Sequence, residues 1–156
     1  MSAMTTSSIL SAAQRRFLMS ARRITLVTSA TDGTPRPVPI CFVLADEGAV
    51  LFTPVDEKPK RTDDPMALAR VRDISADPRV AILADRWDED WTRLAWLRGV
   101  GTAGVTPPSL ADHAGIVAAL RAKYPQYSAH RLEARPLIRV TIERVTSWGA
   151  VGRRQP

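Results

Sequence analysis

An antiparallel β-barrel with peripheral helices is the fold class that the sequence predicts, in a chain that is mainly β. Six segments rich in β-branched residues recur along the 156 residues, and several of them alternate apolar with polar positions. Turn signals such as Asp32-Gly33 separate neighbouring segments, which is typical of hairpins. A hydrophobic content of 45% and a charged content of 24% are ordinary for one globular domain with a buried core.

Local patterns predict the individual elements. Strands are expected over residues 24–31, 35–44, 49–53, 79–85, 94–105 and 137–145. Helices are expected over residues 8–22, 64–77 and 109–123. Ser8 and Asp64 are the predicted N-caps of the first two helices, and Asp77-Pro78 ends the second. The glycines of the fifth strand predict bulges or close backbone approach; they are Gly99, Gly101 and Gly104.

Prolines occupy alternate positions in the first half of the second predicted strand, at Pro35, Pro37 and Pro39. In an extended strand alternate N–H groups point the same way, so all three missing donors lie along one edge. That edge cannot carry a normal antiparallel ladder. This half of the strand is therefore expected at a sheet edge, or facing something other than a partner strand, and a bound ligand is one candidate.

The segment L-F-T-P-V-D-E-K-P-K-R, residues 51–61, is the most informative in the chain. A strand ends there and a loop follows that carries Lys58, Lys60 and Arg61 within four positions. Cations this close are tolerated best around an anion, and the hydroxyl of Thr53 can also bond a phosphate oxygen. The segment predicts a seat for a phosphorylated cofactor. A solvated basic loop is the alternative for such a cluster taken alone.

Composition limits the classes of partner. The formal net charge of +6 favours anionic partners, either nucleic acid or a phosphate-rich small molecule. The single Cys41 excludes an internal disulfide, and neither His113 nor His130 has a carboxylate or cysteine at ligand spacing, so no metal site is expected. No apolar run approaches the roughly 18 residues of a membrane helix, so a cytoplasmic protein is expected. The domain plan is a disordered N-terminus over 1–7, one cofactor-binding domain over 8–150 and a basic tail over 151–156.

Four segments carry a resemblance to a known family. They are T-S-A-T-D-G-T-P-R-P-V-P-I (28–40), F-T-P-V-D-E-K-P-K-R (52–61), I-S-A-D-P-R-V-A-I-L (74–83) and D-R-W-D-E-D-W-T-R-L-A-W-L-R-G-V-G-T-A (85–103). With these, the chain resembles the pyridoxamine 5′-phosphate oxidase-like family of flavin- and deazaflavin-binding split β-barrels over roughly residues 17–148. The fourth segment and the lysine-proline-lysine loop resemble an actinobacterial subgroup of coenzyme F420-dependent oxidoreductases. The fold implied is a six-stranded antiparallel split β-barrel with peripheral helices.

The resemblance implies a homodimer with coenzyme F420 in a groove between the subunits, and hydride transfer between this deazaflavin and a small organic substrate. By position, the phosphate would be held by Lys58, Lys60 and Arg61. The ring would be lined by Val38, Pro39, Ile40, Phe52, Thr53 and Pro54. The C-terminal W-G-A-V-G-R-R-Q-P does not match the substrate-phosphate motif of family oxidases that bind pyridoxal phosphate, which argues against pyridoxamine phosphate oxidation.

Three further residues are candidates for the cofactor site. Arg36 either touches a phosphate or an acidic tail, or faces solvent. Trp91 and Trp148 could wall the pocket by stacking on a tricyclic ring, although core and interface packing are the commoner uses of tryptophan. The carboxylates around Asp88 are expected in a solvated loop or in salt bridges to the basic loop. No side chain stands out as an essential acid or base, and a proton could come from solvent, Tyr124 or Tyr127.

Three rival functions remain on sequence grounds. FMN in the same fold would give an oxidase or reductase. FMN ends in one phosphate, whereas F420 adds a negatively charged lactyl-oligoglutamate tail, and the arginines of the first predicted helix would suit this longer anion. A non-catalytic protein could store a deazaflavin, flavin or haem. A nucleic-acid binder is motivated by the charge, but the sequence lacks a recognisable motif and a basic, aromatic-studded strand face, so no nucleic acid partner is expected.

Overall fold

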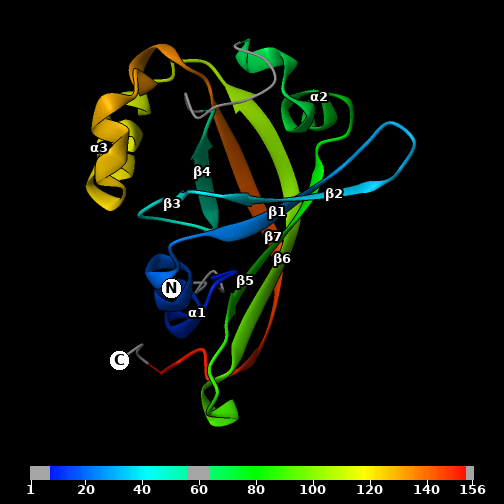
Figure 1. The fold of residues 1–156 in the computed structure, drawn as a ribbon, viewed down its shortest axis with the longest axis vertical. Coiled ribbons are helices and arrows are strands. Elements are labelled where there is room, and N and C mark those ends of the chain that lie inside the picture. The colour runs from blue at the N-terminus through cyan, green and yellow to red at the C-terminus, as the bar shows by residue number, and fades with distance from the viewer. Residues whose placement is uncertain (1–7, 56–63, 154–156) are drawn as a thin grey trace, which may run out of the picture.

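A computed structural model describes residues 8–55 and 64–153, and its centre is one curled antiparallel sheet of seven strands in the order β2-β1-β5-β6-β7-β4-β3 (Figure 1). The strands are β1 (Ile24–Ser29), β2 (Pro35–Ile40), β3 (Val43–Leu44), β4 (Val50–Pro54), β5 (Arg79–Arg86), β6 (Ala95–Thr106) and β7 (Leu137–Gly149). The helices are α1 (Ala12–Ser20), α2 (Ala69–Ala76) and α3 (His113–Lys123). Short 3-10 turns are η1 (Pro65–Ala67), η2 (Trp91–Arg93), η3 (Pro125–Ala129) and η4 (Leu132–Ala134). The predicted mainly β split barrel is confirmed.

The strand number differs from the prediction, because the segment expected as one strand over 35–44 breaks at Cys41 and Phe42 into β2 and β3. These two strands stand at opposite ends of the sheet order. The break has a physical cause: the backbone N–H of Phe42 leaves the ladder and donates to the phenol oxygen of Tyr124 at 3.0 Å. The chain therefore crosses from one edge of the sheet to the other within two residues.

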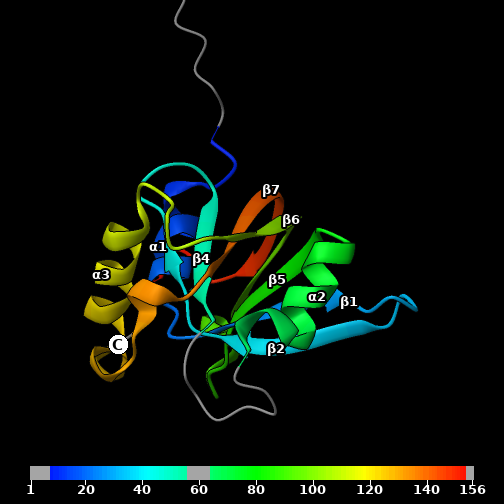
Figure 2. The same ribbon diagram turned by 90° about the horizontal axis from the view of Figure 1, so that it is seen from above.

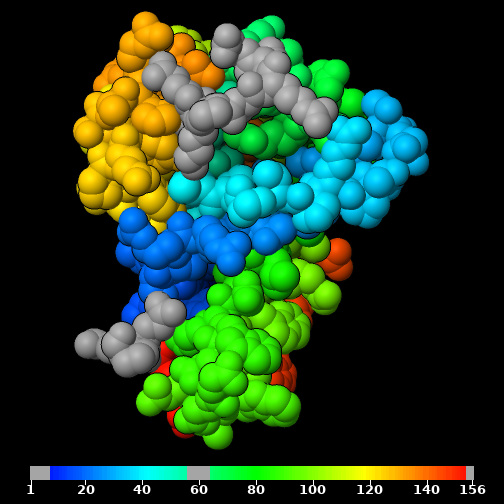
Figure 3. Space-filling model, viewed as in Figure 1, coloured from blue at the N-terminus to red at the C-terminus, as the bar shows by residue number. Residues whose placement is uncertain are grey.

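The position of β2 confirms the expectation drawn from its prolines. β2 pairs with β1 alone and ends the sheet order, so one of its edges carries no strand among the described residues. In the space-filling view the β1–β2 hairpin crosses the surface of the molecule between α3 and the β5–β6 hairpin (Figure 3). Gly33, with φ +83°, closes this hairpin in a conformation that favours glycine.

Two clusters of buried side chains form the core. The larger one fills the concave face of the sheet and includes Leu18 of α1, Leu26, Leu51 and Ile138. The smaller one lies between the other face of β4 and α3, and Phe52 belongs to it. β4 is thus covered on both faces, and α3 and α2 lie on opposite sides of the sheet (Figure 2). No helix in the described part of the chain is long and apolar enough to span a membrane.

All three α-helices begin later than predicted. α1 begins after Ser11, not Ser8, because the Ser11 hydroxyl accepts from the Gln14 N–H while the Gln14 side chain accepts from the Ser11 N–H. α3 begins at His113, four residues later than Ser109. The predicted Asp64 cap is present and accepts from the Met66 N–H, but it opens η1 and not the α-helix itself.

The bulge that the glycines predict in the fifth strand is present. Between Val100 and Gly101 the register of β6 against β7 shifts by one residue. A Cβ atom at Gly101 would collide with the carbonyl oxygen of Thr141. The bulge adds one residue to β7, so Ile142 and Val145 both face the core while Arg144 faces outward. Gly104 meets no such obstruction.

Candidate functional site

The free edge of β2 has an unusual hydrogen-bonding character that follows from its register. Pro35, Pro37 and Pro39 lie opposite Ser29, Val27 and Thr25 of β1. Because proline has no N–H, these must be the non-hydrogen-bonded pairs, and their carbonyls point away from β1. The outer edge of β2 therefore presents carbonyl acceptors without N–H donors. Such an edge resists pairing with another strand and suits a ligand that donates hydrogen bonds.

A buried carboxylate lies under the same strand. Asp73 of α2 is only 4% exposed, and its Oδ2 accepts a hydrogen bond of 2.9 Å from the hydroxyl of Thr28, which is itself buried. Its other oxygen, Oδ1, lies 3.4 Å from Nη1 of Arg36 on β2. Arg36 and Thr28 face each other across the β1–β2 ladder, so the three side chains form one cluster that ties α2 to the hairpin.

The cluster explains the conformation of Arg36. Burying a carboxylate is costly unless it is paired and hydrogen-bonded, and among the described residues Asp73 has one hydroxyl and one guanidinium as partners. The Arg36 side chain stays 47% exposed while that of Asp73 is 6% exposed, so the guanidinium has one side on the carboxylate and the rest open to solvent. Arg36 is therefore a cation at the protein surface that Asp73 holds in place. It lies in the strand whose outer edge has no N–H donors at its prolines.

The predicted phosphate loop cannot be compared with this cluster directly. Lys58, Lys60 and Arg61 lie outside the described residues. On one side of the loop, Val55 directly follows β4, and its N–H donates to the Pro136 carbonyl at 3.3 Å; on the other side, Asp64 caps η1, which leads to α2. The loop therefore connects β4 to the helix that carries Asp73.

The predicted ring-lining residues fall into two groups. Ile40 is buried, Val38 is half-buried and Pro39 is exposed on the edge strand β2. Phe52, Thr53 and Pro54 are all buried within β4, with Thr53 only 1% exposed. Ile40 belongs to the larger core cluster, and Val38 packs against it. Leu51 and Val55, which lie on the same face of the chain as Thr53, belong to this cluster too. The two groups thus border one core, although their strands are not paired.

The two candidate tryptophans lie elsewhere in the subunit. Trp148 is 54% exposed on β7 and stands opposite Trp96 of β6. Trp91 is 71% exposed and starts η2, in the turn between β5 and β6. That turn lies at the far end of the long β5–β6 hairpin from α2 (Figure 1). The fold of the chain therefore does not bring Trp91 next to the β2 residues.

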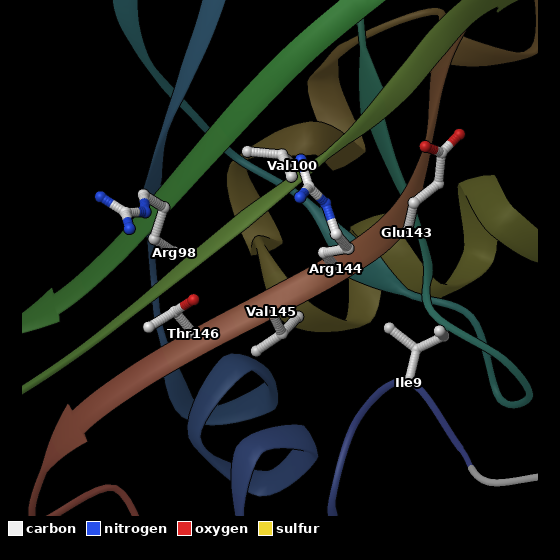
Figure 4. A pocket seen from close by; sticks show the side chains of 7 residues that line it. All are labelled: Ile9, Arg98, Val100, Glu143, Arg144, Val145 and Thr146. Atoms are coloured by element: carbon white, nitrogen blue, oxygen red, sulfur yellow. The ribbon is translucent and has the colours of Figure 1, made fainter.

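A cavity of about 690 Å³ lies at β6 and β7, beside the bulge (Figure 4). The side chain of Arg144 extends from β7 toward Val100 of β6. Arg98 lines the cavity as well, and Glu143 points away from Arg144. The register puts Arg98, Val100 and Arg144 on one face of the sheet. We call this convex side of β5, β6 and β7 the outer face. Its exposed or half-exposed residues include Leu83, Trp96, Arg98, Arg144 and Trp148.

Several residues of these sites escaped sequence reasoning. The sequence predicts a helix around Asp73 but not its partners, because Thr28 and Arg36 lie 45 and 37 residues away in the chain. The outward direction of Arg98 could have been read from strand alternation. That of Arg144 could not, because the bulge shifts the alternation of β7 by one residue.

The two tyrosines considered as proton donors are both buried. Burial raises the pKa of Tyr124, and its phenol oxygen is engaged by the backbone of Phe42 and the carbonyl of Arg22. Tyr127 is 2% exposed and packs edge-to-face on Tyr124 at 5.6 Å. The acidic loop is solvated and partly paired within itself, with Arg93 at 3.8 Å from Asp88 and 3.7 Å from Asp90. The described residues include no group of three or more His, Cys, Asp or Glu side chains that could hold a metal ion.

The curled sheet, the donor-free edge of β2 and the surface cation Arg36 describe a split barrel. Residues 10–149 match the family model of pyridoxamine 5′-phosphate oxidase, and the chain belongs to this family.

Solved structures agree in fold. The conserved hypothetical protein Rv2991 of Mycobacterium tuberculosis is 20% identical with a TM-score of 0.70, covering 92% of this chain and 88% of its own. The haem storage protein HutZ of Vibrio cholerae is 15% identical with a TM-score of 0.64, covering 86% and 90%. An F420 reductase is 21% identical with a TM-score of 0.61, covering 85% and 94%. No curated protein matches the chain.

Proposed function

We propose that this protein is an oxidoreductase that transfers a hydride between coenzyme F420 and a small organic substrate. The observation that carries the proposal is Arg36, a surface cation fixed by the buried carboxylate of Asp73 beside an edge strand that offers only acceptors. Bound F420 would supply the redox chemistry through its deazaflavin ring, while the protein would orient the ring and exclude water. A fold shared with an F420 reductase supports the proposal.

The residues present fit such a cofactor in two respects. An F420 molecule carries a phosphate and a carboxylate tail, which fit Arg36 together with Lys58, Lys60 and Arg61 in a chain of net charge +6. A deazaflavin ring also carries an N–H group, and the outward carbonyls of β2 are acceptors for it. Val38 and Ile40 supply apolar side chains next to this edge.

The outer face of β5, β6 and β7 supports a homodimer with the cofactor between the subunits. Leu83 is 39% exposed and Trp148 is 54% exposed on this face, which also carries Arg98 and Arg144, two of the residues that line the 690 Å³ cavity. Tryptophan and arginine are enriched at protein interfaces, and contiguous exposed apolar side chains favour a partner. A second copy of the chain is the proposed partner, which would also bring Trp148 of one subunit toward the cofactor of the other.

Two alternatives share the fold. FMN would fit the same phosphate and ring positions, making the protein a flavin-dependent oxidase or reductase. A storage role is the second alternative: HutZ, which has the same fold, is a haem storage protein. The described part of the chain offers no assigned acid or base, which a storage protein would not need.

The test is cofactor binding and turnover with matched variants. Purified protein is titrated with F420, FMN and haem by fluorescence or absorbance, and reduced F420 is then offered with enones and quinones. We expect micromolar F420 affinity, weakened about tenfold or more by Arg36→Gln and by the Lys58→Ala/Lys60→Ala pair. Arg79→Gln is the control, because Arg79 is 82% exposed in its side chain and pairs only locally with Asp77.

Each result has a defined meaning. A preference for FMN would assign the flavin alternative, and binding of haem without turnover would assign storage. F420 binding that survives both site variants would contradict the proposed phosphate site. Failure to bind any of the three ligands would overturn the proposed function.

A further inference from the structure

The acidic loop between β5 and β6, residues 87–93, carries two large aromatic side chains that the fold leaves uncovered. Trp87 is 68% exposed and Trp91 is 71% exposed, the highest values among the large hydrophobic side chains of the described residues. Three carboxylates separate them in the sequence W-D-E-D-W. Large exposed aromatic side chains with polar neighbours are typical of interaction surfaces. The loop lies at the far end of the hairpin from α2, so the proposed cofactor site does not use it (Figure 1).

The protein's own chain closes one side of this hairpin end. The guanidinium of Arg86 donates to the carbonyl of Arg153 at 3.1 Å and lies 5.4 Å from the ring centre of Phe17 in α1. It also donates to the carbonyl of Arg93 at 3.1 Å. Phe17 belongs to the core cluster that fills the concave face. The concave side of the hairpin end is therefore occupied, and a partner can reach the acidic loop from the outer face.

The outer face carries a cavity of complementary character. Arg98 and Arg144 line the 690 Å³ cavity beside the bulge, together with the apolar side chains of Val100 and Val145 (Figure 4). Glu143 lines it as well but points away from Arg144. Among the described residues no carboxylate forms an ion pair with either arginine. Two cations beside an apolar wall match a segment in which carboxylates lie next to indole rings.

The order of residues along β6 allows two copies to make this contact reciprocally. Trp96 lies between the acidic loop on one side and Arg98 and Val100 on the other, and Trp148 of β7 stands opposite it. Val100 is four residues beyond Trp96, about 13 Å of strand. In a two-fold symmetric dimer the same patch of both subunits makes the interface. A two-fold axis near Trp96 and Trp148 therefore places the acidic loop of each subunit at the cavity of the other.

We propose that the acidic loop of one subunit docks into the cavity between Arg98 and Arg144 of a second copy of the chain. Trp87 and Trp91 cover the apolar wall, and Glu89 pairs with Arg144. The inference rests on the homodimer of the proposed function and names the contact that holds it together. The contact needs neither F420 nor any other cofactor.

Glu89 is the carboxylate best placed to pair with a partner. Its described contact is with the neutral indole N–H of Trp87 at 3.2 Å, whereas Asp88 and Asp90 already face Arg93. Burial of the two tryptophans removes apolar surface from water, which favours association. The ion pair fixes the register of the two subunits and excludes wrong partners.

The first test is an exchange of charges across the contact. The dissociation constant of the full-length dimer is measured by sedimentation equilibrium at low ionic strength. Glu89→Lys and Arg144→Glu each set like charges against each other, so each should raise the dissociation constant about tenfold or more. The double variant Glu89→Lys/Arg144→Glu restores opposite charges and should return to within about threefold of the parent.

Matched controls separate this contact from the overall charge. Glu47→Lys and Arg72→Glu make the same reversals at exposed residues away from the outer face, in the β3–β4 turn and on α2. Neither should change the dissociation constant. Circular dichroism verifies that every variant is folded.

The second test follows the tryptophans of the acidic loop directly. The chain has four tryptophans, so the Trp96→Phe/Trp148→Phe background keeps only Trp87 and Trp91. On dimer formation their emission should move to shorter wavelength, and acrylamide should quench them severalfold less. Adding Arg144→Glu to this background should keep both signals at their monomer values at the same protein concentration.

Several results would overturn the proposal. They are a monomer in solution, a dimer whose loop tryptophans stay open to acrylamide, single reversals without effect, and a double variant whose losses merely add. If Arg144→Glu weakens binding of F420 or citrate and leaves the dimer unchanged, the cavity is a site for small anions and the proposal fails. F420 titration of the parent dimer is a separate measurement: a dimer that passes both tests and binds no F420 would refute the proposed function and leave the docking contact intact.

Discussion

The phenol oxygen of Tyr124 accepts the backbone N–H of Phe42 at 3.0 Å and lies 3.1 Å from the carbonyl oxygen of the same residue. One side chain at the end of α3 thus occupies both ladder groups of a residue 82 positions earlier. The carbonyl of Arg22 lies 3.0 Å from the same oxygen. Tyr124 therefore holds the chain at the point where it leaves one edge of the sheet for the other.

Tyr124→Phe should weaken this junction while keeping the aromatic packing. The N–H of Phe42 would lose its partner in a buried place, which costs about 1–3 kcal/mol in the free energy of unfolding. Urea denaturation followed by tryptophan fluorescence measures the change. A variant as stable as the parent would show that another group or water satisfies the Phe42 backbone.

How far the sequence predicted the fold depends on the range of the interactions. The prolines of β2 act on their own strand, and the edge position they predict is confirmed. The break at Phe42 depends on Tyr124, which no local pattern links to it. The α1 boundary follows from a local pattern, because Ser11 and Gln14 have the spacing of a capping box, whereas residue type alone favours Ser8 equally.

The same reasoning applies to the site. Arg36 was a candidate because it lies in the proline-rich strand, but its partner Asp73 is on a different element and was visible only in the fold. Conversely, the aromatic ring of Trp91 makes it a candidate, but the long β5–β6 hairpin holds it away from β2. Residue type predicts which chemistry is available, while long-range pairing decides which residues share a site.

The Arg36–Asp73 pair should show an asymmetric response to mutation. Among the described partners of Asp73, Arg36→Met leaves only the Thr28 hydroxyl, and we expect this to cost about 1–3 kcal/mol in unfolding free energy. Asp73→Asn leaves an exposed guanidinium in water and should cost less. In the Arg36→Met/Asp73→Asn double variant part of the loss should return, because no buried charge remains. Denaturant unfolding of the three variants gives this double-mutant cycle, and strictly additive effects would contradict the coupling.

Two glycines of β6 provide a matched test of the bulge. Gly101→Ala forces a Cβ against the Thr141 carbonyl, and because backbone must move, we expect a loss of about 2–4 kcal/mol. Gly104→Ala places its Cβ in open space on the same strand and should be neutral or slightly stabilising. Thermal unfolding of both variants measures the difference. Equal effects would indicate that the register shift tolerates a side chain at Gly101.

Acid stability should depend in part on Glu133. Hydrogen bonds from the Arg121 guanidinium lower the pKa of Glu133 from 4.5 to about 2, and one of them measures 2.9 Å. A carboxyl whose folded pKa is depressed adds stability above its unfolded pKa and loses it as the pH falls through the folded value. Its contribution is therefore complete above pH 4.5, declines below it and is gone below about pH 2.

Glu133→Gln removes this contribution, so the variant should melt at a lower temperature than the parent at pH 6, and the two melting curves should converge as the pH approaches 2. Arg121→Gln tests the same pair from the other side: the pH-dependent part of its loss should also vanish toward pH 2, but a constant part should remain, because Arg121 also donates to the carbonyls of Tyr127 and His130. Melting temperatures of the three proteins between pH 2 and 6 provide the comparison. A constant difference across this range would assign the loss to packing around η4 and not to the ion pair.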